Sequence, residues 1–151
     1  MISRKGKYGI RALLYIARQP ESCPVSVEQI ASSEGIPRKF LEAIMLELKL
    51  GGLVHSSRGK GGGYTLQKTP KRITIGQIIR AVDGPIAPVP CVSATAYAPC
   101  TDCPEESTCA VRLVMLEVRE AISRVVDLKT LEALLEEADV LAPSDSHSFH
   151  I

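Results

Sequence analysis

The chain has 151 residues and only 4% aromatic side chains, a length that fits one domain or a small domain with an appendage. Its formal net charge of +1 hides an asymmetry: residues 1–80 carry 14 of the 18 Lys and Arg and 5 of the 17 acids, a net of +9. Residues 81–151 carry the other 4 bases and 12 acids, a net of −8. A basic half indicates a polyanionic partner, most simply nucleic acid. No stretch approaches the roughly 18 apolar residues of a membrane span, and arginine interrupts the first apolar segment, so we expect a cytoplasmic protein without a signal peptide.

The first helix is predicted over about residues 3–18, where apolar residues recur at helical spacing. Arg4, Lys7, Arg11 and Arg18 fall near a second, basic stripe of this helix. Most such stripes are only solvated surface. In a basic half-chain the stripe is also a candidate for phosphate contacts, and we assign Arg4 and Lys7 to the candidate DNA-binding residues.

Two helices joined by a glycine turn follow. Ser26 and Gln29 form a capping box that starts a short helix ending near residue 33. Gly35 lies in a tight turn, and Pro37 opens a second helix at a position where its missing N–H costs nothing. That helix runs to Leu50, before two glycines. This spacing is typical of a helix-turn-helix.

A glycine-rich hairpin follows the second helix directly. Residues 53–56 and 64–66 are short strand candidates, and the tip between them is Ser57-Arg58-Gly59-Lys60-Gly61-Gly62-Gly63. The tip lacks the Gly-Lys-Ser/Thr ending of a nucleotide-binding loop and does not lead into a helix, so we reject that interpretation. A hairpin in this place is the wing of a winged helix-turn-helix.

These elements predict a set of DNA contacts. The second helix of the pair is expected to enter the major groove with its N-terminal residues at the base edges. Arg38 and Lys39 would contact phosphate or guanine, and Glu42 could accept from a cytosine amino group. Arg58 and Lys60 at the wing tip would reach phosphates or the minor groove.

Four of the five cysteines lie between Pro90 and Cys109. They are Cys91, Cys100, Cys103 and Cys109, in a segment without apolar periodicity that is interrupted by prolines. A long irregular loop is usually disordered or organised by something it binds, and four thiols favour the second interpretation. Thiolates suit zinc or iron–sulfur clusters. A disulfide and four unremarkable thiols are the alternatives, although stable disulfides are uncommon in the cytosol. Cys23 lies far away in the sequence.

A second capping box, at Thr74 and Gln77, opens a helix that ends near residue 82. After the cysteines a long helix is predicted over residues 107–126, about 30 Å in length. Its apolar seam is formed by Val111, Val114, Met115, Val118, Ile122 and Val125. The small winged unit alone cannot cover such a seam. We therefore expect the helix to pack against its twin in a homodimer, the alternative being a helix folded back on its own domain.

The chain ends in a short helix and a polar segment. Asp127 is expected to cap a final helix that runs to about residue 138. Residues 143–151 form a polar tail in which His147 and His150 are possible but unconvincing metal ligands.

Three segments resemble one bacterial family. Ile2–Tyr8, the wing Arg58–Tyr64 and the helix Thr74–Asp83 are similar to those of the Rrf-type winged-helix transcription regulators, a group that includes IscR, NsrR and CymR. The likeness covers about residues 1–135. It implies a winged-helix homodimer that binds pseudo-palindromic double-stranded DNA. For the cluster-binding members it also implies an iron–sulfur cluster, 2Fe–2S rather than 4Fe–4S.

The cysteines depart from the family pattern in two ways. The resemblance implies three cysteine ligands and one other, and Cys91, Cys103 and Cys109 match the three best. The interval from Cys91 to Cys103 is longer than usual and contains the additional Cys100. The position of a histidine ligand in IscR is Arg112 here, and arginine stays protonated and cannot serve. Either Cys100 completes an all-cysteine site, or the fourth ligand comes from elsewhere.

We therefore expect a mainly α fold with a small β-hairpin, a winged helix-turn-helix followed by a long C-terminal dimerisation helix. The expected division is a DNA-binding domain over residues 1–84, a cluster-binding loop over 85–106, dimerisation helices over 107–140 and a flexible tail over 141–151.

The expected function is a transcription regulator, most simply a repressor, whose operator affinity depends on the cluster and responds to iron, redox state or nitric oxide. A zinc-binding or cluster-free regulator that responds to thiol state or to a protein partner is the alternative. A metal–sulfur electron carrier is less favoured, because it needs no helix-turn-helix. No nucleophile–base pair or paired carboxylates stand out, so we do not expect an enzyme.

Overall fold

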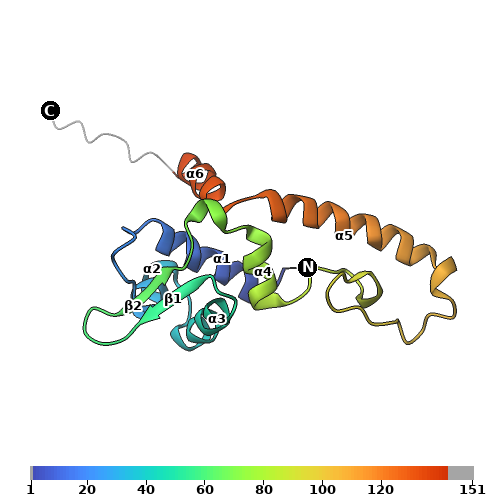
Figure 1. Cartoon of the computed structure of the whole chain (residues 1–151), viewed down its shortest axis with the longest axis horizontal. Helices are drawn as coiled ribbons and strands as arrows, with labels where there is room; N and C mark the ends of the chain where they lie inside the picture. The colour runs from blue at the N-terminus through green and yellow to red at the C-terminus, as the bar shows by residue number, and fades with distance from the viewer. Residues whose placement is uncertain (1, 143–151) are drawn as a thin grey trace.

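The structure is a computed structural model that describes residues 2–142. Within them the chain forms six α-helices and one two-stranded antiparallel hairpin (Figure 1). In order these are α1 (Arg4–Ala17), α2 (Val27–Glu34), α3 (Arg38–Leu50), β1 (Val54–Ser57), β2 (Gly63–Leu66), α4 (Ile75–Asp83), α5 (Ala110–Leu128) and α6 (Leu131–Leu141). The first helix, the hairpin and the helix-turn-helix are confirmed, to within about two residues of the predicted bounds.

Side-chain caps fix the starts of several helices. Ser3 precedes α1 and accepts a hydrogen bond from the Gly6 N–H. Both predicted capping boxes are present, at Ser26 before α2 and at Thr74 before α4. Each of these hydroxyls satisfies a backbone N–H that has no partner within its helix, so the helix boundaries follow directly from local sequence.

The turn between α2 and α3 depends on glycine. Gly35 ends α2 with φ of 62°, a left-handed conformation that costs a residue with a side chain more than it costs glycine. Pro37 was predicted to be the first helical residue but lies just before α3, with ψ of 126°. It still starts the helix, because its carbonyl accepts from the Leu41 N–H at 3.0 Å.

The wing is held to the body at its second strand. β1 and β2 pair from Val54↔Leu66 to Ser57↔Gly63, leaving residues 58–62 as the tip. Val25, before α2, forms a bridge with Tyr64 through two backbone hydrogen bonds of 2.9 and 2.7 Å. Gly63 is required there, because a Cβ on it would lie 2.5 Å from the Val25 carbonyl oxygen.

A single core joins the winged elements to the C-terminal helix. Its fully buried members include Leu13 of α1, Leu41 of α3, Ile78 of α4 and Leu131 of α6. The Leu131 N–H donates to the Ile73 carbonyl at 2.8 Å. The chain therefore leaves the winged unit after α4 and returns to it at α6.

Helix α5 lies mostly outside this core. Figure 1 shows it extending away from the body, with the cysteine-containing segment beside its distant end. It begins at Ala110 and not at 107, because residues 106–108 form a 3₁₀ turn and Cys109 is the N-cap. None of its residues is buried in the single chain.

The predicted cap of the last helix was wrong. Asp127 lies in the last turns of α5, where its carboxylate accepts two hydrogen bonds from Arg80 at 2.6 and 2.9 Å. Thr130 caps α6 instead, accepting from the Ala133 N–H. His147 and His150 lie outside the described residues, and within those residues no helix is long and apolar enough to cross a membrane.

Candidate nucleic-acid interface and cysteine-rich loop

Helix α3 is attached to the start of α1 by an aromatic pair and an ion pair. The rings of Tyr8 and Phe40 meet edge to face, with centroids 5.7 Å apart. Lys5 Nζ lies 2.8 Å from Glu47 Oε1. These contacts hold the basic start of α1 beside the helix that was predicted to enter the major groove.

The first turn of α3 presents charged side chains to solvent. Arg38 lies between two carboxylates, with Glu28 of α2 at 2.9 Å and Glu42 at 3.0 Å. Arg38 and Glu42, both predicted to contact DNA, are therefore paired with each other in the free protein. Lys39 beside them is exposed.

Several exposed cations of the basic half have no ion-pair partner among residues 2–142. They are Arg4 and Lys7 at the start of α1, Lys39 and Lys49 of α3, Arg58 and Lys60 at the hairpin tip, and three residues after β2 (Lys68, Lys71 and Arg72). Unpaired surface cations are free to replace the counterions of a phosphate backbone. Every element that was predicted to touch DNA therefore carries at least one exposed cation without an ion-pair partner in the described part of the chain.

The cysteine loop brings two thiols into contact. Cys91 is buried in a 3₁₀ turn, Pro90–Val92, and its Sγ lies 3.8 Å from that of Cys100. This hydrogen bond, together with partial desolvation, raises the pKa of Cys100. The pKa of Cys103 is raised as well, mainly by desolvation and then by its hydrogen bond with the Cys109 thiol. A metal would have to displace protons from these thiols.

Cys109 and Arg112 connect the loop to the start of α5. Cys109 is the N-cap, and its sulfur accepts from the Arg112 N–H at 3.4 Å. The Arg112 guanidinium is ion-paired with Glu106 at 3.0 Å. Glu106 also accepts from the Tyr97 hydroxyl, which raises the pKa of Tyr97. Arg112 therefore supports the loop as a cation.

Two polar contacts attach the loop to its neighbours, and the sequence did not reveal either. Asp83, the last residue of α4, binds the start of α1 through the N–H and hydroxyl of Ser3. Arg119 of α5 donates to the Val92 carbonyl at 2.8 Å, next to Cys91. The partners are 80 and 27 residues apart, so local sequence carries no signal for them.

The ion pair between Arg80 of α4 and Asp127 of α5 is a third contact between distant segments. It holds the pKa of Asp127 below its ordinary value, because the charged carboxylate accepts hydrogen bonds from Arg80. A lowered carboxyl pKa means that the contact is fully present at neutral pH and weakens only as acid protonates the group.

The donor set of the loop fits a soft metal centre. Four thiols within twenty residues can become thiolates, the ligands that zinc and iron–sulfur clusters prefer. Across residues 2–142 no three Cys, His, Asp or Glu side chains lie close enough together to hold one ion. Two of the four thiols are in contact, since the Sγ atoms of Cys91 and Cys100 lie 3.8 Å apart.

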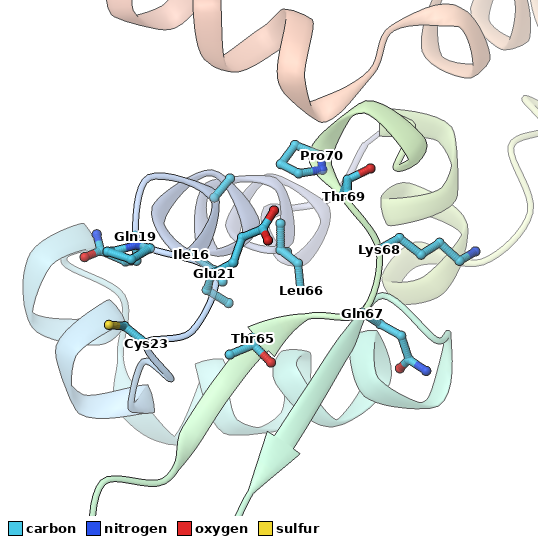
Figure 2. Close-up of a pocket in the computed structure, with 12 residues that line it drawn as sticks. Ile16, Gln19, Glu21, Cys23, Thr65, Leu66, Gln67, Lys68, Thr69 and Pro70 are labelled. Atoms are coloured by element: carbon cyan, nitrogen blue, oxygen red, sulfur yellow. The ribbon is translucent and has the colours of Figure 1, made fainter.

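Cys23 is separate from the other four cysteines. It is exposed and lines a cavity of about 320 Å³ between the end of α1 and the segment after β2 (Figure 2). None of the other residues that line this cavity is a cysteine. Cys23 is therefore a suitable control for changes at the loop cysteines.

A winged helix-turn-helix with free cations on its recognition elements defines a DNA-binding transcription regulator, not an enzyme. The chain belongs to the Rrf2 family, described as iron-dependent transcriptional regulators, whose sequence profile matches residues 2–137.

Individual relatives agree with this assignment. A putative rrf2-like transcriptional regulator of Rhodobacter capsulatus is 44% identical over 138 residues, covering 89% of this chain and 92% of the relative. The structure of CymR, the global cysteine regulator of B. subtilis, superposes with a TM-score of 0.74 at 36% identity and covers 91% of this chain and 97% of that one. The T. potens IscR structure gives 0.73 at 28% identity, with coverage of 99% and 96%. The resemblance to Rrf-type regulators is confirmed.

Proposed function

We propose that this protein is a homodimeric repressor whose operator affinity is set by a 2Fe–2S cluster on the cysteine loop, in response to iron, redox state or nitric oxide. The observation that carries the proposal is the set of four thiols in the segment that joins α4 to α5. The family description as iron-dependent regulators and the similarity to T. potens IscR support it.

The segment that carries the loop is connected to the start of α1 before the loop begins, and to α5 next to Cys91. At the N-terminal end, Asp83 binds Ser3, one residue before the candidate phosphate contact Arg4. Farther along, Arg119 fixes the backbone of Val92 on α5. Cys91, Cys100, Cys103 and Cys109 would hold the cluster, which when bound would cross-link residues 91–109. Without this cross-link the loop gains conformational freedom, and an order–disorder change at Asp83 would alter the position of α1 on DNA.

For DNA, we propose that α3 enters the major groove while the wing tip contacts the backbone. Lys39 is free to contact phosphate or guanine. Arg38 and Glu42 would first have to exchange their mutual ion pair for contacts to the bases, which adds a desolvation cost to binding. The division into DNA-binding, loop and dimerisation segments is part of this proposal.

Removal of a wing cation tests the DNA contacts. We expect Arg58→Ala to weaken binding to a duplex selected by the wild-type protein, and to lower the slope of log K against log salt by about 1 for each phosphate that the wing no longer neutralises. Arg124→Ala is the matched control, since Arg124 is exposed on α5, outside the basic half. Equal affinities of the Arg58 variant and wild type at every salt concentration would show that the wing does not contact the backbone.

The dimer is supported by exposed apolar surface. In the single chain the seam residues Val111, Val114, Val118 and Val125 are exposed, and Met115 and Ile122 are only half-buried. The seam continues into an apolar cavity of about 550 Å³. This cavity is lined mainly by apolar residues of α4, α5 and the 85–88 segment, together with Ile2 and Ile10. A second copy of α5 would cover both surfaces. The apolar seam of one protomer would fill the apolar cavity of the other.

Metal analysis of the wild-type protein tests the cofactor. Purified without oxygen, it should absorb broadly in the visible and contain about two irons and two sulfides per chain, as a 2Fe–2S cluster requires. Colourless protein with one zinc per chain would favour the structural-zinc alternative, which the same thiols would suit. Colourless protein without any metal would leave a regulator that senses thiol state or a protein partner.

A further inference from the structure

We infer that the outer face of α3 recognises thymine, through contacts of the Ala43 and Leu46 side chains with thymine C5-methyl groups in the major groove. The ligand is then a duplex with thymine at the contacted positions of each half-site. This inference rests on the proposed function and adds to it a sequence preference and the two residues that determine that preference.

Helix α3 has two apolar rows on opposite sides. The row that packs into the core is fully buried and consists of Leu41, Ile44, Met45 and Leu48. At about 3.6 residues per turn, a second row lies on the side away from the core. Its members are all exposed, and they are Lys39, Ala43, Leu46 and Leu50. Leu46 alone keeps 54% of its surface open to solvent, so the fold itself does not require an apolar residue there.

Contacts with neighbouring helices occupy the two flanks of α3 and leave the outer row open. On one flank, Phe40 and Glu47 contact residues of α1. On the other flank, Arg38 is ion-paired with Glu28 of α2. Figure 1 shows α3 at the lower edge of the body. Isolated surface leucines are ordinary, but a row of apolar side chains on the helix that is proposed to enter the groove indicates a binding surface.

The spacing of the outer residues suits a helix that lies in the major groove. Lys39, Glu42, Ala43 and Leu46 are spaced i, i+3, i+4 and i+7. The recognition helix of homeodomains contacts bases with the same spacing, and its C-terminal end contacts the backbone. By this geometry Ala43 and Leu46 face base edges, whereas Leu50, the last residue of α3, lies past them.

The chemistry of these two side chains selects thymine. In the major groove the bases present hydrogen-bonding groups, and thymine presents a methyl group as well. Ala43 and Leu46 have side chains that neither donate nor accept hydrogen bonds. Against the edge of guanine, adenine or cytosine they would cover polar groups without satisfying them, which is unfavourable. Against a thymine methyl group both partners bury apolar surface.

The charges around the outer row fit duplex DNA as its occupant. Four exposed cations without an ion-pair partner among residues 2–142 lie on α3 and on the wing, namely Lys39, Lys49, Arg58 and Lys60. Apolar side chains between cations match a groove whose floor carries methyl groups and whose rims carry phosphates. An apolar segment of a protein partner would not require these cations.

Deoxyuridine in place of thymidine tests the contact, because it removes only the C5-methyl group. A duplex is first selected from random sequence with wild-type protein prepared without oxygen. Its thymidines are then replaced one at a time. We expect two positions in each half-site at which the affinity falls about fourfold when the methyl group is lost. This ratio should be the same at low and high salt, since a neutral methyl group releases no counterions.

Leu46→Ala identifies the side chain that makes one of these contacts. At one of the two positions this variant should bind thymidine and deoxyuridine duplexes equally well, while the position that Ala43 contacts keeps its preference. Leu50→Ala is the matched control, because it is the same replacement on the same row and should keep the wild-type preference at both positions.

Two results would overturn the inference and leave the proposed function intact. One is sequence-specific binding by wild type that no deoxyuridine weakens, which would leave the row as a surface for a protein partner. The other is a Leu46→Ala variant that keeps the full thymine preference at every position. A wild-type protein that selects no sequence from the random duplexes would overturn the proposed function itself.

Discussion

Serine at Cys109 is expected to give a colourless protein that keeps its fold. Cys109 caps α5, and serine is among the best N-cap residues, so the helix start should survive the replacement. As an iron ligand, however, serine is much poorer than a thiolate. We expect loss of the visible absorption, loss of nearly all iron and a far-ultraviolet circular dichroism spectrum equal to that of wild type.

The same loss of colour is expected for Cys91→Ser and Cys103→Ser, because the ligands share one centre. Cys91 is buried, so its variant also places a hydroxyl in an apolar site and is compared with wild type only after its unfolding temperature has been measured. Cys23→Ser should keep full colour. If the Cys109 variant retains the wild-type iron and spectrum, Cys109 is not a ligand and the cluster site has to lie elsewhere.

Local features of the chain were predictable because local chemistry determines them. The capping hydroxyls of Ser26 and Thr74 act on backbone groups three residues away, and Gly35 is identified by the left-handed turn that it permits. The wing could be recognised from glycine spacing and its position after the helix-turn-helix. These signals lie within a few residues, so one sequence contains them completely.

Apart from shifts of a few residues at helix starts, the errors and omissions involve contacts between distant segments. Aspartate is a common N-cap residue, so Asp127 was predicted to start the last helix. Arg80, 47 residues earlier, binds its carboxylate instead, and Asp127 lies inside α5. Cys100 contacts Cys91, nine residues earlier, because the intervening loop folds back. The packing of Leu131 in the winged core could not be predicted either. The apolar pattern of a short helix is the same whether the helix packs on its own domain or on a partner.

Val118→Asp is expected to separate the dimer and abolish operator binding. Val118 belongs to the seam and also lines the 550 Å³ cavity, so in the proposed dimer it is buried by the second protomer. In the single chain its exposed fraction is 37%, and a carboxylate there costs the monomer little. In a two-fold dimer each protomer would bury one unpaired carboxylate. This costs about 3 kcal/mol or more, which corresponds to a loss of at least about 100-fold in the association constant.

Sedimentation at several protein concentrations measures this effect. Val140→Asp is the matched control, because Val140 of α6 is 84% exposed and lies off the seam. We expect a dimer for wild type and the Val140 variant, and a folded monomer for the Val118 variant with an unchanged far-ultraviolet spectrum. That monomer can contact only one half of a pseudo-palindromic operator, so its affinity should fall with its ability to dimerise. A well-folded Val118 variant that sediments as an intact dimer would remove the α5 seam as the interface, because an interface that buries this position in both protomers would be weakened by two unpaired carboxylates.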